Sequence, residues 1–378
     1  MKHFHYIFTG SGLAALMTVY KMVQSGKFND KNILLLDENL KKTNDRTWCF
    51  WEKGIGNWDK IVSKKWNSVS FSNTNFSRDL DIQPYLYKMI QGLDFYNLVF
   101  DLLSKQKNIT FLNEKVTDIN ELENHVYVAT ENNSFNCEHV FNSIYNKPIQ
   151  SKYPILQQHF IGWRIKSEEV VFNPEQATFM DFSIAQKGNT RFMYVLPTSK
   201  TEALIEYTLF SHSLLAKEEY EKAIEEYIQK LGIEQYEIIE KEQGSIPMTC
   251  YPFWKKNTKR VLNIGTAGGW TKASTGYTFK NTDKHSSRLI AFLETNSDFR
   301  KFHTKNRFWF YDLLLLDILD RQNELGSHIF SSIFKNGNPN LIFKFLDEET
   351  SFSQDIKVIL KCPTMLFLTA FFKSFRYL

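Results

Sequence analysis

Several residue types that mark particular classes of protein are scarce in this chain. Only four of its 378 residues are cysteines, and they form neither a C-x-x-C pair nor a zinc-ligand spacing, so we expect no metal site and a reducing compartment. Glycine (16) and proline (9) are too few for a collagen-like or proline-rich chain. No apolar run reaches the roughly 18 residues that a membrane-spanning helix needs.

Positive and negative charges are also nearly balanced. The chain has 46 Lys and Arg against 42 Asp and Glu, a formal net charge of +4, and the basic residues are scattered along the sequence. This pattern argues against a nucleic-acid-binding protein. The N-terminal residues include a Lys and two His and lack a cleavage site, so we expect no export signal and a cytoplasmic protein.

Aromatic residues, in contrast, are abundant, at 15% of the chain. Two interpretations stay open: a compositional bias that also explains the many Lys, Asn and Ile residues, or a large apolar cavity walled by aromatic rings. With 43% hydrophobic and 23% charged residues, the composition is that of a globular protein.

The N-terminal segment has the order of a mononucleotide-binding unit. An apolar strand at His5–Phe8, a helix over Gly12–Ser25 and an apolar strand at 32–36 predict a β-α-β unit in a parallel sheet. A G-x-G-x-x-A motif opens the helix, and an acid ends the second strand, 25 residues after the second glycine (37 − 12). This order favours a dinucleotide site over a glycine turn with a helix-capping Asp. Its expected contacts are Gly10, Ser11, Gly12, Leu13, Ala14 and Asp37.

A second glycine-rich loop follows a predicted strand at 261–264. It contains Gly265, Ala267 and Trp270, and a Ser-Thr-Gly-Tyr block with Gly276 and Tyr277 leads into another predicted helix. Many flavoproteins complete an FAD site with such a downstream loop, although a structural strand–helix turn explains the pattern equally well.

The middle of the chain predicts a long amphipathic helix at 84–107 and an antiparallel sheet between Phe160 and Ser211. Glu206 interrupts an apolar strand of this sheet. If it faces the core, it is a carboxylic acid with a raised pKa. If it faces outward, which alternation by itself favours, it is an ordinary surface residue. Everything after Phe299 is predicted to be mostly helical.

A set of motifs then occurs in an order typical of one enzyme family. The motifs are Gly10–Ala15, Asp37, the Asn-Asp-Arg-Thr-Trp block from Asn44, a Leu-Pro-Thr followed by Ile205–Thr208, Lys272–Tyr277 and Phe345–Thr350. In this order the chain resembles the bacterial FAD-dependent lycopene β-cyclases of carotenoid biosynthesis, from about residue 3 to about residue 372. The Asn-Asp-Arg-Thr-Trp and Ser-Thr-Gly-Tyr blocks are fairly specific, whereas the first glycine loop is not.

The resemblance implies an α/β (α+β) fold similar to that of hydroxybenzoate-hydroxylase-type flavoproteins. It combines a Rossmann-like FAD-binding domain, an antiparallel-sheet substrate domain and a helical C-terminal region. The implied division assigns residues 1–75 and 256–298 to the FAD-binding domain and 76–150 to its further helix and strands. Residues 151–255 form the substrate domain, and 299–378 form a helical region that faces the substrate and the membrane.

The resemblance also implies a chemistry. The family converts the ψ ends of lycopene into β-ionone rings, giving γ-carotene and then β-carotene without net oxidation, and needs reduced FAD with NAD(P)H as electron source. Glu206 occupies the position of the family's acidic Phe-Leu-Glu-Glu-Thr-like motif, with Tyr207 in place of the second Glu. A second acidic cluster at 347–349 is either a further candidate acid or a solvated helix end.

The block after the second strand is expected to cross the cofactor. Arg46 is a candidate phosphate or ribose contact, although a surface Arg explains it equally well. The expected substrate-lining residues are Trp48, Trp51, Tyr207 and Trp270.

A C40 hydrocarbon dissolves in lipid, so the expected partners are lycopene, other ψ-ended carotenoids and a membrane surface. We expect a cytoplasmic protein held peripherally on the inner face of the cell membrane. The segments 308–316 and 365–376 pair apolar and basic residues, as an interfacial helix does, or else pack as core helices.

Two other functions stay open. A flavin-dependent monooxygenase or epoxidase acting on an apolar isoprenoid often carries an Asp-Gly motif that Asn142–Asn146 lacks, and a flavin halogenase motif stops short at Gly162–Ile165. A carotenoid- or lipid-binding protein with an inert flavoprotein fold would bind lycopene without turnover.

Overall fold

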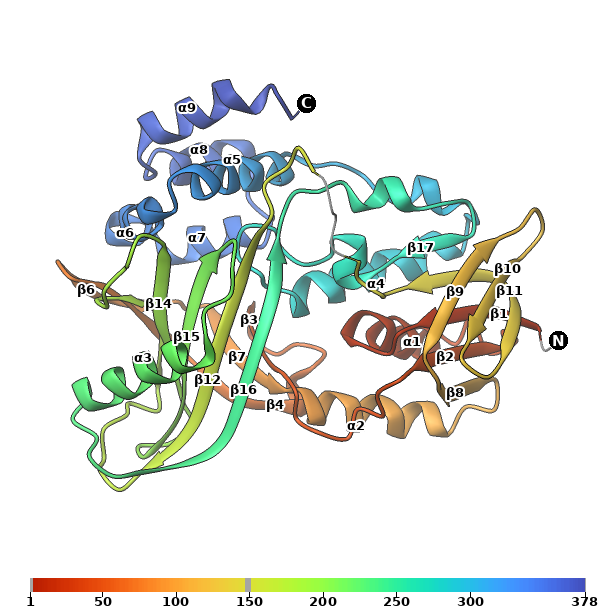
Figure 1. Ribbon diagram of the computed structural model, residues 1–378, viewed down its shortest axis with the longest axis horizontal. Helices are drawn as coiled ribbons and strands as arrows, with labels where there is room; N and C mark the ends of the chain where they lie inside the picture. Colours follow the sequence, from red (N-terminus) through yellow and green to blue (C-terminus); the bar gives the residue numbers. More distant parts are fainter. Residues whose placement is uncertain (1–2, 147–150, 378) are drawn as a thin grey trace.

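The computed structural model describes residues 3–146 and 151–377. Its first sheet (Figure 1, right) is parallel from β8 to β11 and continues into an antiparallel extension, β10 and β9. Its strands, in spatial order, are β8 (Ile109–Asn113), β2 (Ile33–Asp37), β1 (His3–Thr9), β11 (Ser134–Asn142), β10 (Val126–Thr130) and β9 (Val116–Glu121). The short β17 (Val261–Asn263) pairs in parallel with the end of β11 and thereby brings the second glycine loop beside the first.

The two faces of this sheet are covered differently. On one face Phe8 and Leu35 pack against the helices α1 (Leu13–Ser25), α2 (Gly92–Ser104) and α4 (Phe279–Leu293). On the other face Ile7 and Leu34 pack with residues of β10 and β11. Successive strand residues point to opposite faces, and both faces of this sheet are covered. The centres of β1 and β2 are therefore apolar and buried at every position. The predicted β-α-β unit is confirmed.

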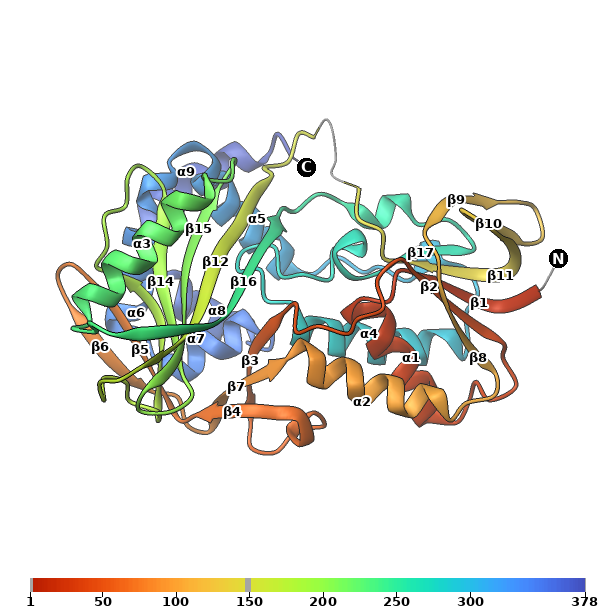
Figure 2. The same cartoon turned by 60° about the horizontal axis from the view of Figure 1, so that its bottom comes forward.

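The second sheet (Figure 1, left) is antiparallel apart from one pair, β13 with β5. Its strands, in spatial order, are β16 (Tyr236–Met248), β12 (Leu156–Ser167), β15 (Glu202–Ser211), β14 (Thr190–Pro197), β13 (Gln176–Phe182), β5 (Ser68–Asn73) and β6 (Ser77–Asp81). The helix α3 (Lys217–Lys230) covers one face. In Figure 2, β16 is the strand of this sheet nearest to the first sheet.

The prediction of a helix over 84–107 is wrong in its first third. Tyr85–Gln91 forms β7, the central strand of a third sheet between β3 (Thr47–Lys53) and β4 (Val62–Trp66), and only then does α2 begin. The segment pairs on both edges and buries Tyr87 and Met89 completely. Pairing with strands distant in sequence therefore overrides the local helical periodicity.

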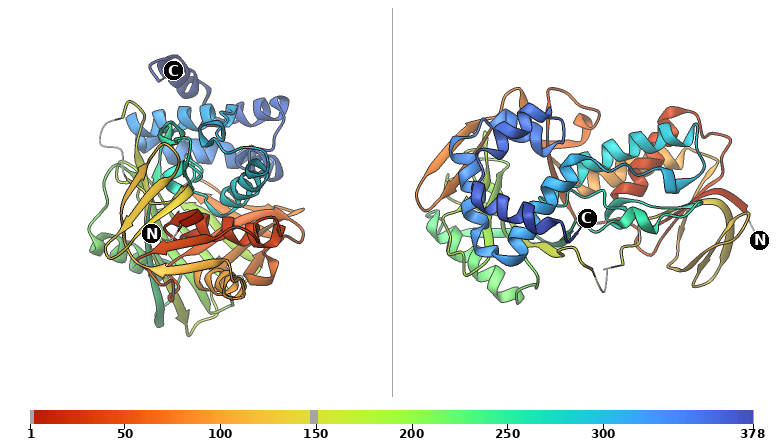
Figure 3. Two further views of the ribbon diagram at one scale, coloured as in Figure 1. Left: turned by 90° about the vertical axis from the view of Figure 1, so that its right-hand side faces the viewer. Right: turned by 90° about the horizontal axis from the view of Figure 1, so that it is seen from above.

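The helical C-terminal region lies over one end of the second sheet, as Figure 3 shows from above. Its helices are α5 (Arg307–Arg321), α6 (Gly326–Asn336), α7 (Pro339–Leu346), α8 (Phe352–Ile359) and α9 (Thr364–Ser374). Leu313 and Leu316 of α5 pack into the same core as Phe179 and Phe182 of β13. The segment 308–316 is thus largely core packing.

The acidic cluster at 347–349 is not a solvated helix end, because its three carboxylates are paired with lysines. Lys272 Nζ lies 2.8 Å from both Asp312 and Glu348 carboxylates. Two lysines of α4 complete the network, Lys280 with Asp347 at 2.5 Å and Lys284 with Glu349 at 2.9 Å. These ion pairs fasten the C-terminal region to α4 and to the second glycine loop.

Replacing Lys272 with Met should lower the free energy of unfolding by about 3–5 kcal/mol, because Asp312 would be left as a buried charge without a partner. Chemical denaturation measures this. Lys105→Met is the matched control, since Lys105 forms an exposed pair with Asp101 and its loss should cost less than about 1 kcal/mol. Equal stability of the Lys272 variant and wild type would contradict this stabilising role of the Lys272 ion pairs.

Candidate active site

A cleft of about 760 Å³ lies between the first and second sheets. Its walls come from the start of α1, the segment 45–49, the inner faces of β12, β14 and β15, and the block 275–279 that precedes α4. These are the segments that carry the motifs found in the sequence, and they meet only because the two sheets face each other.

The first glycine loop leaves open space for a ligand. Gly12 and Leu13 line the cleft, and a Cβ built on Gly12 would meet no atom within 4 Å. Behind them, Asp37 Oδ2 accepts hydrogen bonds from the Ser11 N–H at 2.6 Å and the Ser11 hydroxyl at 2.9 Å. Gly10 has a φ of +92°, a conformation that favours glycine. The loop therefore presents the N-terminus of α1 to the cleft in a fixed conformation.

The second glycine loop packs directly on the first. A Cβ on Gly265, whose φ is +59°, would lie 3.0 Å from the Cβ of Ala14, so the close approach and the backbone conformation both favour glycine. Ala267 is buried behind this contact. Gly276 and Tyr277 line the cleft itself.

Three buried polar atoms of the cleft wall have no hydrogen-bond partner within the described residues. They are Tyr145 OH, Gln158 Oε1 and Thr275 Oγ1. Buried polar atoms are nearly always paired, so these are positions at which a polar ligand would bind. Together with the open space at Gly12, they fit a large cofactor that has both phosphate and heteroaromatic groups.

Arg46 and Trp48 both line the cleft, at its edge next to α2. Arg46 Nη1 donates to the carbonyl of Asp45 at 2.6 Å, and Asp45 Oδ1 accepts from Tyr96 OH at 2.8 Å. Trp48 packs edge-on against Phe95, with ring centroids 5.5 Å apart. The structure thus places both residues where a cofactor contact is possible.

Glu206 faces the cleft, on the side that alternation alone did not favour. It is 7% exposed, and Thr208 Oγ1 donates to its Oε1 at 2.6 Å. Loss of water and, next, the neighbouring Glu242 carboxylate raise the pKa of Glu206 to about 8. The protonated form of this carboxyl is therefore favoured.

Glu242, on β16, is a residue that the sequence reasoning missed. It is half-buried, its Oε2 accepts from Thr47 Oγ1 at 2.7 Å, and burial raises its pKa also. In the sequence Glu242 is one of several Glu in a polar strand, and only its place two strands away from Glu206 distinguishes it.

Three of the expected substrate-lining residues lie elsewhere. Tyr207 points to the opposite face of β15, where it accepts from Arg191 Nη1 at 2.8 Å and packs under α3, because neighbours along a strand alternate between faces. Trp270 is stacked on His285 outside the cleft. Trp51 lies behind Tyr277, with ring centroids 4.7 Å apart, and donates to the Phe343 carbonyl.

A second cavity, of about 380 Å³, continues beneath the C-terminal helices. Its lining is mostly apolar and comes from β13, the loop 272–277 and the segment from α5 to α9. Four residues line both cavities: Phe179, Met180, Thr275 and Tyr277. The polar cleft and the apolar cavity thus adjoin at an aromatic wall, in which the rings of Phe179 and Tyr277 are stacked 6.3 Å apart.

Comparison with solved structures identifies the fold. The chain is similar to a flavoprotein/dehydrogenase from Cytophaga hutchinsonii, with a TM-score of 0.62 and 12% identity over 99% of this chain and 100% of that one. It is similar to a geranylgeranyl bacteriochlorophyll reductase-like protein from Thermoplasma acidophilum, with a TM-score of 0.60 and 10% identity over 97% and 98%. It is also similar to a variant of the halogenase PltM in complex with FAD, with a TM-score of 0.61 and 13% identity over 95% of this chain and 86% of that one. At such identities the likeness shows the fold, a Rossmann-type FAD-binding flavoprotein fold.

The sequence model of the lycopene cyclase protein family matches residues 6–371, and the chain therefore belongs to the lycopene cyclase family. A curated relative, lycopene beta-cyclase of Pantoea ananas, is 29% identical over 141 residues. That match covers 35% of this chain and 36% of the relative, so it spans about a third of the relative's length. The expected fold class and family are both confirmed.

Gly12→Val should abolish flavin binding, because the valine side chain would occupy the open space at the start of α1. Flavin fluorescence after reconstitution and gel filtration measures the loss. Gly12 has a φ of −77°, which valine tolerates, so the thermal unfolding of the flavin-free variant should match that of wild type. Undiminished flavin binding by this folded variant would place the pyrophosphate elsewhere.

Proposed function

We propose that this protein is a lycopene β-cyclase that closes the ψ ends of lycopene into β-ionone rings, giving γ-carotene and then β-carotene. The reaction is redox-neutral and acid-catalysed, an intramolecular lyase or isomerase reaction. The observation that carries the proposal is the buried Glu206 carboxyl, which stands at the family's acidic motif and faces a cleft that adjoins an apolar cavity.

The chemistry needs a desolvated acid. A proton must reach C2 of the terminal alkene and leave a tertiary cation at C1, which the C5–C6 double bond then attacks before a proton leaves C6. Because an alkene is a weak base, the acid must be protonated and shielded from water. Burial supplies both conditions at Glu206, and Thr208 fixes the orientation of its carboxyl.

The cation must also be stabilised without meeting a nucleophile. The wall between the two cavities offers the faces of Phe179 and Tyr277, with Trp51 packed behind them. Aromatic faces attract positive charge and carry no lone pair that would trap it as readily as water does. Tyr277 OH is engaged with Tyr87 OH at 3.1 Å, and burial raises its pKa, so it remains a neutral phenol.

The cleft fits FAD as the cofactor, with NAD(P)H as the proposed source of its electrons. Gly12 and Leu13 would hold its pyrophosphate at the N-terminus of α1, and Gly276 and Thr275 would lie along its heteroaromatic part. When bound in reduced form, FAD would supply negative charge near the carbocation.

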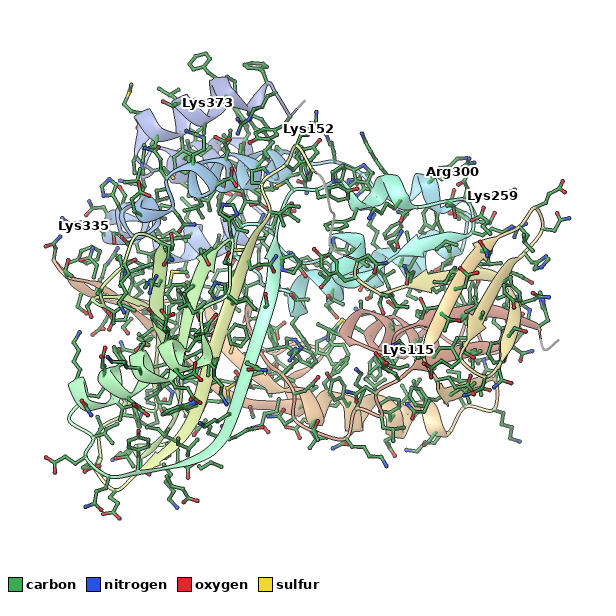
Figure 4. The ribbon with its side chains drawn as sticks, in the orientation of Figure 1. Lys115, Lys152, Lys259, Arg300, Lys335 and Lys373 are labelled. Carbon is green, nitrogen blue, oxygen red and sulfur yellow. The ribbon has the colours of Figure 1, made fainter. Side chains whose placement is uncertain are left out.

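The route from the membrane would pass through the apolar cavity. Among the described residues no helix is both long and apolar enough to cross a bilayer. The outer faces of α8 and α9 nevertheless expose large apolar side chains: Phe352, Ile356, Leu360, Met365, Leu368, Phe371, Phe372 and Phe375. Five of these also line the cavity, which therefore opens on this surface. Lys373 projects from α9 beside them (Figure 4), as in an interfacial helix on anionic lipid.

The double variant Leu360→Asp with Phe372→Asp should lower binding to anionic vesicles at least about tenfold, because two apolar side chains would no longer enter the lipid. Both residues are more than half exposed, at 67% and 69%, so the fold should survive. Vesicle flotation measures the binding. Val170→Asp, at a 72% exposed position away from α8 and α9, is the matched control. If both variants float like wild type, the C-terminal helices do not contact the membrane.

The proposed reaction is tested by anaerobic incubation of the protein with lycopene in liposomes, FAD and a reductant, followed by separation of the pigments. Cyclised product without oxygen supports a cyclase. Oxygenated product after admission of air would support a monooxygenase, and bound but unchanged lycopene would support a binding protein.

Glu206→Gln should lower the cyclisation rate by a factor of about 100 to 10,000, because it keeps the shape of the side chain and removes its acidic proton. FAD binding should be unchanged. In wild type the rate should fall as the pH rises through about 8, since the raised pKa means that the proton is present below that pH and lost above it. Glu202→Gln, at the start of the same strand, is the control. Normal turnover by Glu206→Gln with loss in Glu349→Gln would show that the acid lies in the C-terminal cluster.

A further inference from the structure

Glu206 and Glu242 approach each other across a glycine. They lie on β15 and β16, the two strands that flank β12, and Gly162 of β12 is the register partner of both. A Cβ at Gly162 would lie 3.4 Å from Cγ of Glu206 and 3.3 Å from Cγ of Glu242. The two Glu side chains therefore lean over Gly162 from opposite sides, and the Glu242 carboxyl helps to raise the pKa of Glu206.

The surroundings of the two carboxyls differ. Glu206 lines the cleft, whereas Glu242 does not and lies under the segment that carries Thr47. Arg164 and Arg46 act on Glu242 and favour its charged form, while Glu240 opposes them. No cation acts on Glu206 among the groups that shift its pKa. Burial raises the pKa of both carboxyls, but only on Glu242 do nearby cations oppose the rise, so a proton shared by the pair is favoured on Glu206.

We propose that Glu242 is a positioning residue that shares one proton with Glu206 across Gly162 and keeps that proton on the carboxyl that faces the cleft. This inference rests on the proposed cyclisation. Each ring closure moves the shared proton from Glu206 to C2 and returns the proton released at C6 to the carboxyl pair, so the pair needs no oxidant, reductant or other co-reactant to return to its starting state.

The remaining groups around the pair are neutral. Thr208 donates a hydrogen bond to Glu206, and Tyr194 of β14 is the register partner of Glu206. Burial raises the pKa of Cys49 to about 12 and raises those of Tyr194 and Tyr277 as well. Removing the negative charge of Glu242 is therefore expected to make Glu206 give up its proton at lower pH.

The test compares the pH dependence of single-turnover cyclisation in wild type, Glu242→Gln, Glu242→Asp and Glu237→Gln. In Glu242→Gln the alkaline fall in rate should move to lower pH by at least about one unit, a tenfold change in the protonated fraction at the alkaline end. At the acid end its rate should stay within about twofold of wild type, because Gln can still accept from Thr47. Glu242→Asp should restore most of the alkaline limb, and Glu237→Gln, at an exposed position on β16, should leave the profile unchanged.

A profile of Glu242→Gln that coincides with wild type would overturn the proposal. So would an equal loss at every pH, which is the result expected of a merely structural residue.

Infrared difference spectra of the purified protein during pH titration give a readout that does not need turnover. A protonated-carboxyl C=O band should titrate in wild type, be lost in Glu206→Gln and titrate at lower pH in Glu242→Gln. If these spectra are found while wild type forms no cyclic product, the proposed function fails and the carboxyl pair stands. If cyclisation proceeds but Glu242→Gln leaves the band unmoved, the pair fails and the proposed function stands.

Discussion

The removal of Glu206 from water is the constraint on which the site depends. An ionised carboxylate at this depth would lose several kcal/mol of hydration, so the group holds a proton instead. The strands around it are built to tolerate that state. Gly162 leaves room for two carboxyls, Thr208 satisfies one oxygen of Glu206, and Thr47 satisfies one of Glu242. The same burial that makes the carboxyl costly to ionise favours its protonated form, which is the form that a general acid needs.

Contacts elsewhere in the molecule hold the segments that line the cleft in place. β17 pairs with β11 and so sets the second glycine loop against Ala14 of the first. The lysines at 272, 280 and 284 tie the acidic turn 347–349 to α4, which begins just after the block that lines the cleft. The cluster that offered a rival acid in the sequence is thus a fastening between the C-terminal helices and the remainder of the chain. Two of the many aromatic residues, Phe179 and Tyr277, form the wall at which the cleft and the apolar cavity meet.

Local sequence patterns correctly predicted the elements that pack against elements adjacent to them in the sequence. The strand–glycine loop–helix–strand order of the first 37 residues needed no knowledge of the remaining chain, and the structure has it as expected. The same reasoning failed for Tyr85–Gln91, whose helical spacing is overridden by pairing on both edges, and for Tyr207, where a shift of one residue along a strand changes the face. The prediction that Trp270 lines the cleft was wrong for a related reason, since a loop can direct a side chain to either side.

The sequence by itself determined the N-terminal β-α-β unit, the two glycine loops and the presence of a carboxyl in an apolar strand, because each is a property of consecutive residues. Only the tertiary structure decided that Glu206 faces the cleft, that Glu242 lies across Gly162 from it, and that an apolar cavity adjoins them. The physical reason is that the pKa of a carboxyl is set by what surrounds it in space. Glu206 and Glu242 are 36 residues apart in the chain (242 − 206), and the strand between them in space, β12, precedes both in sequence.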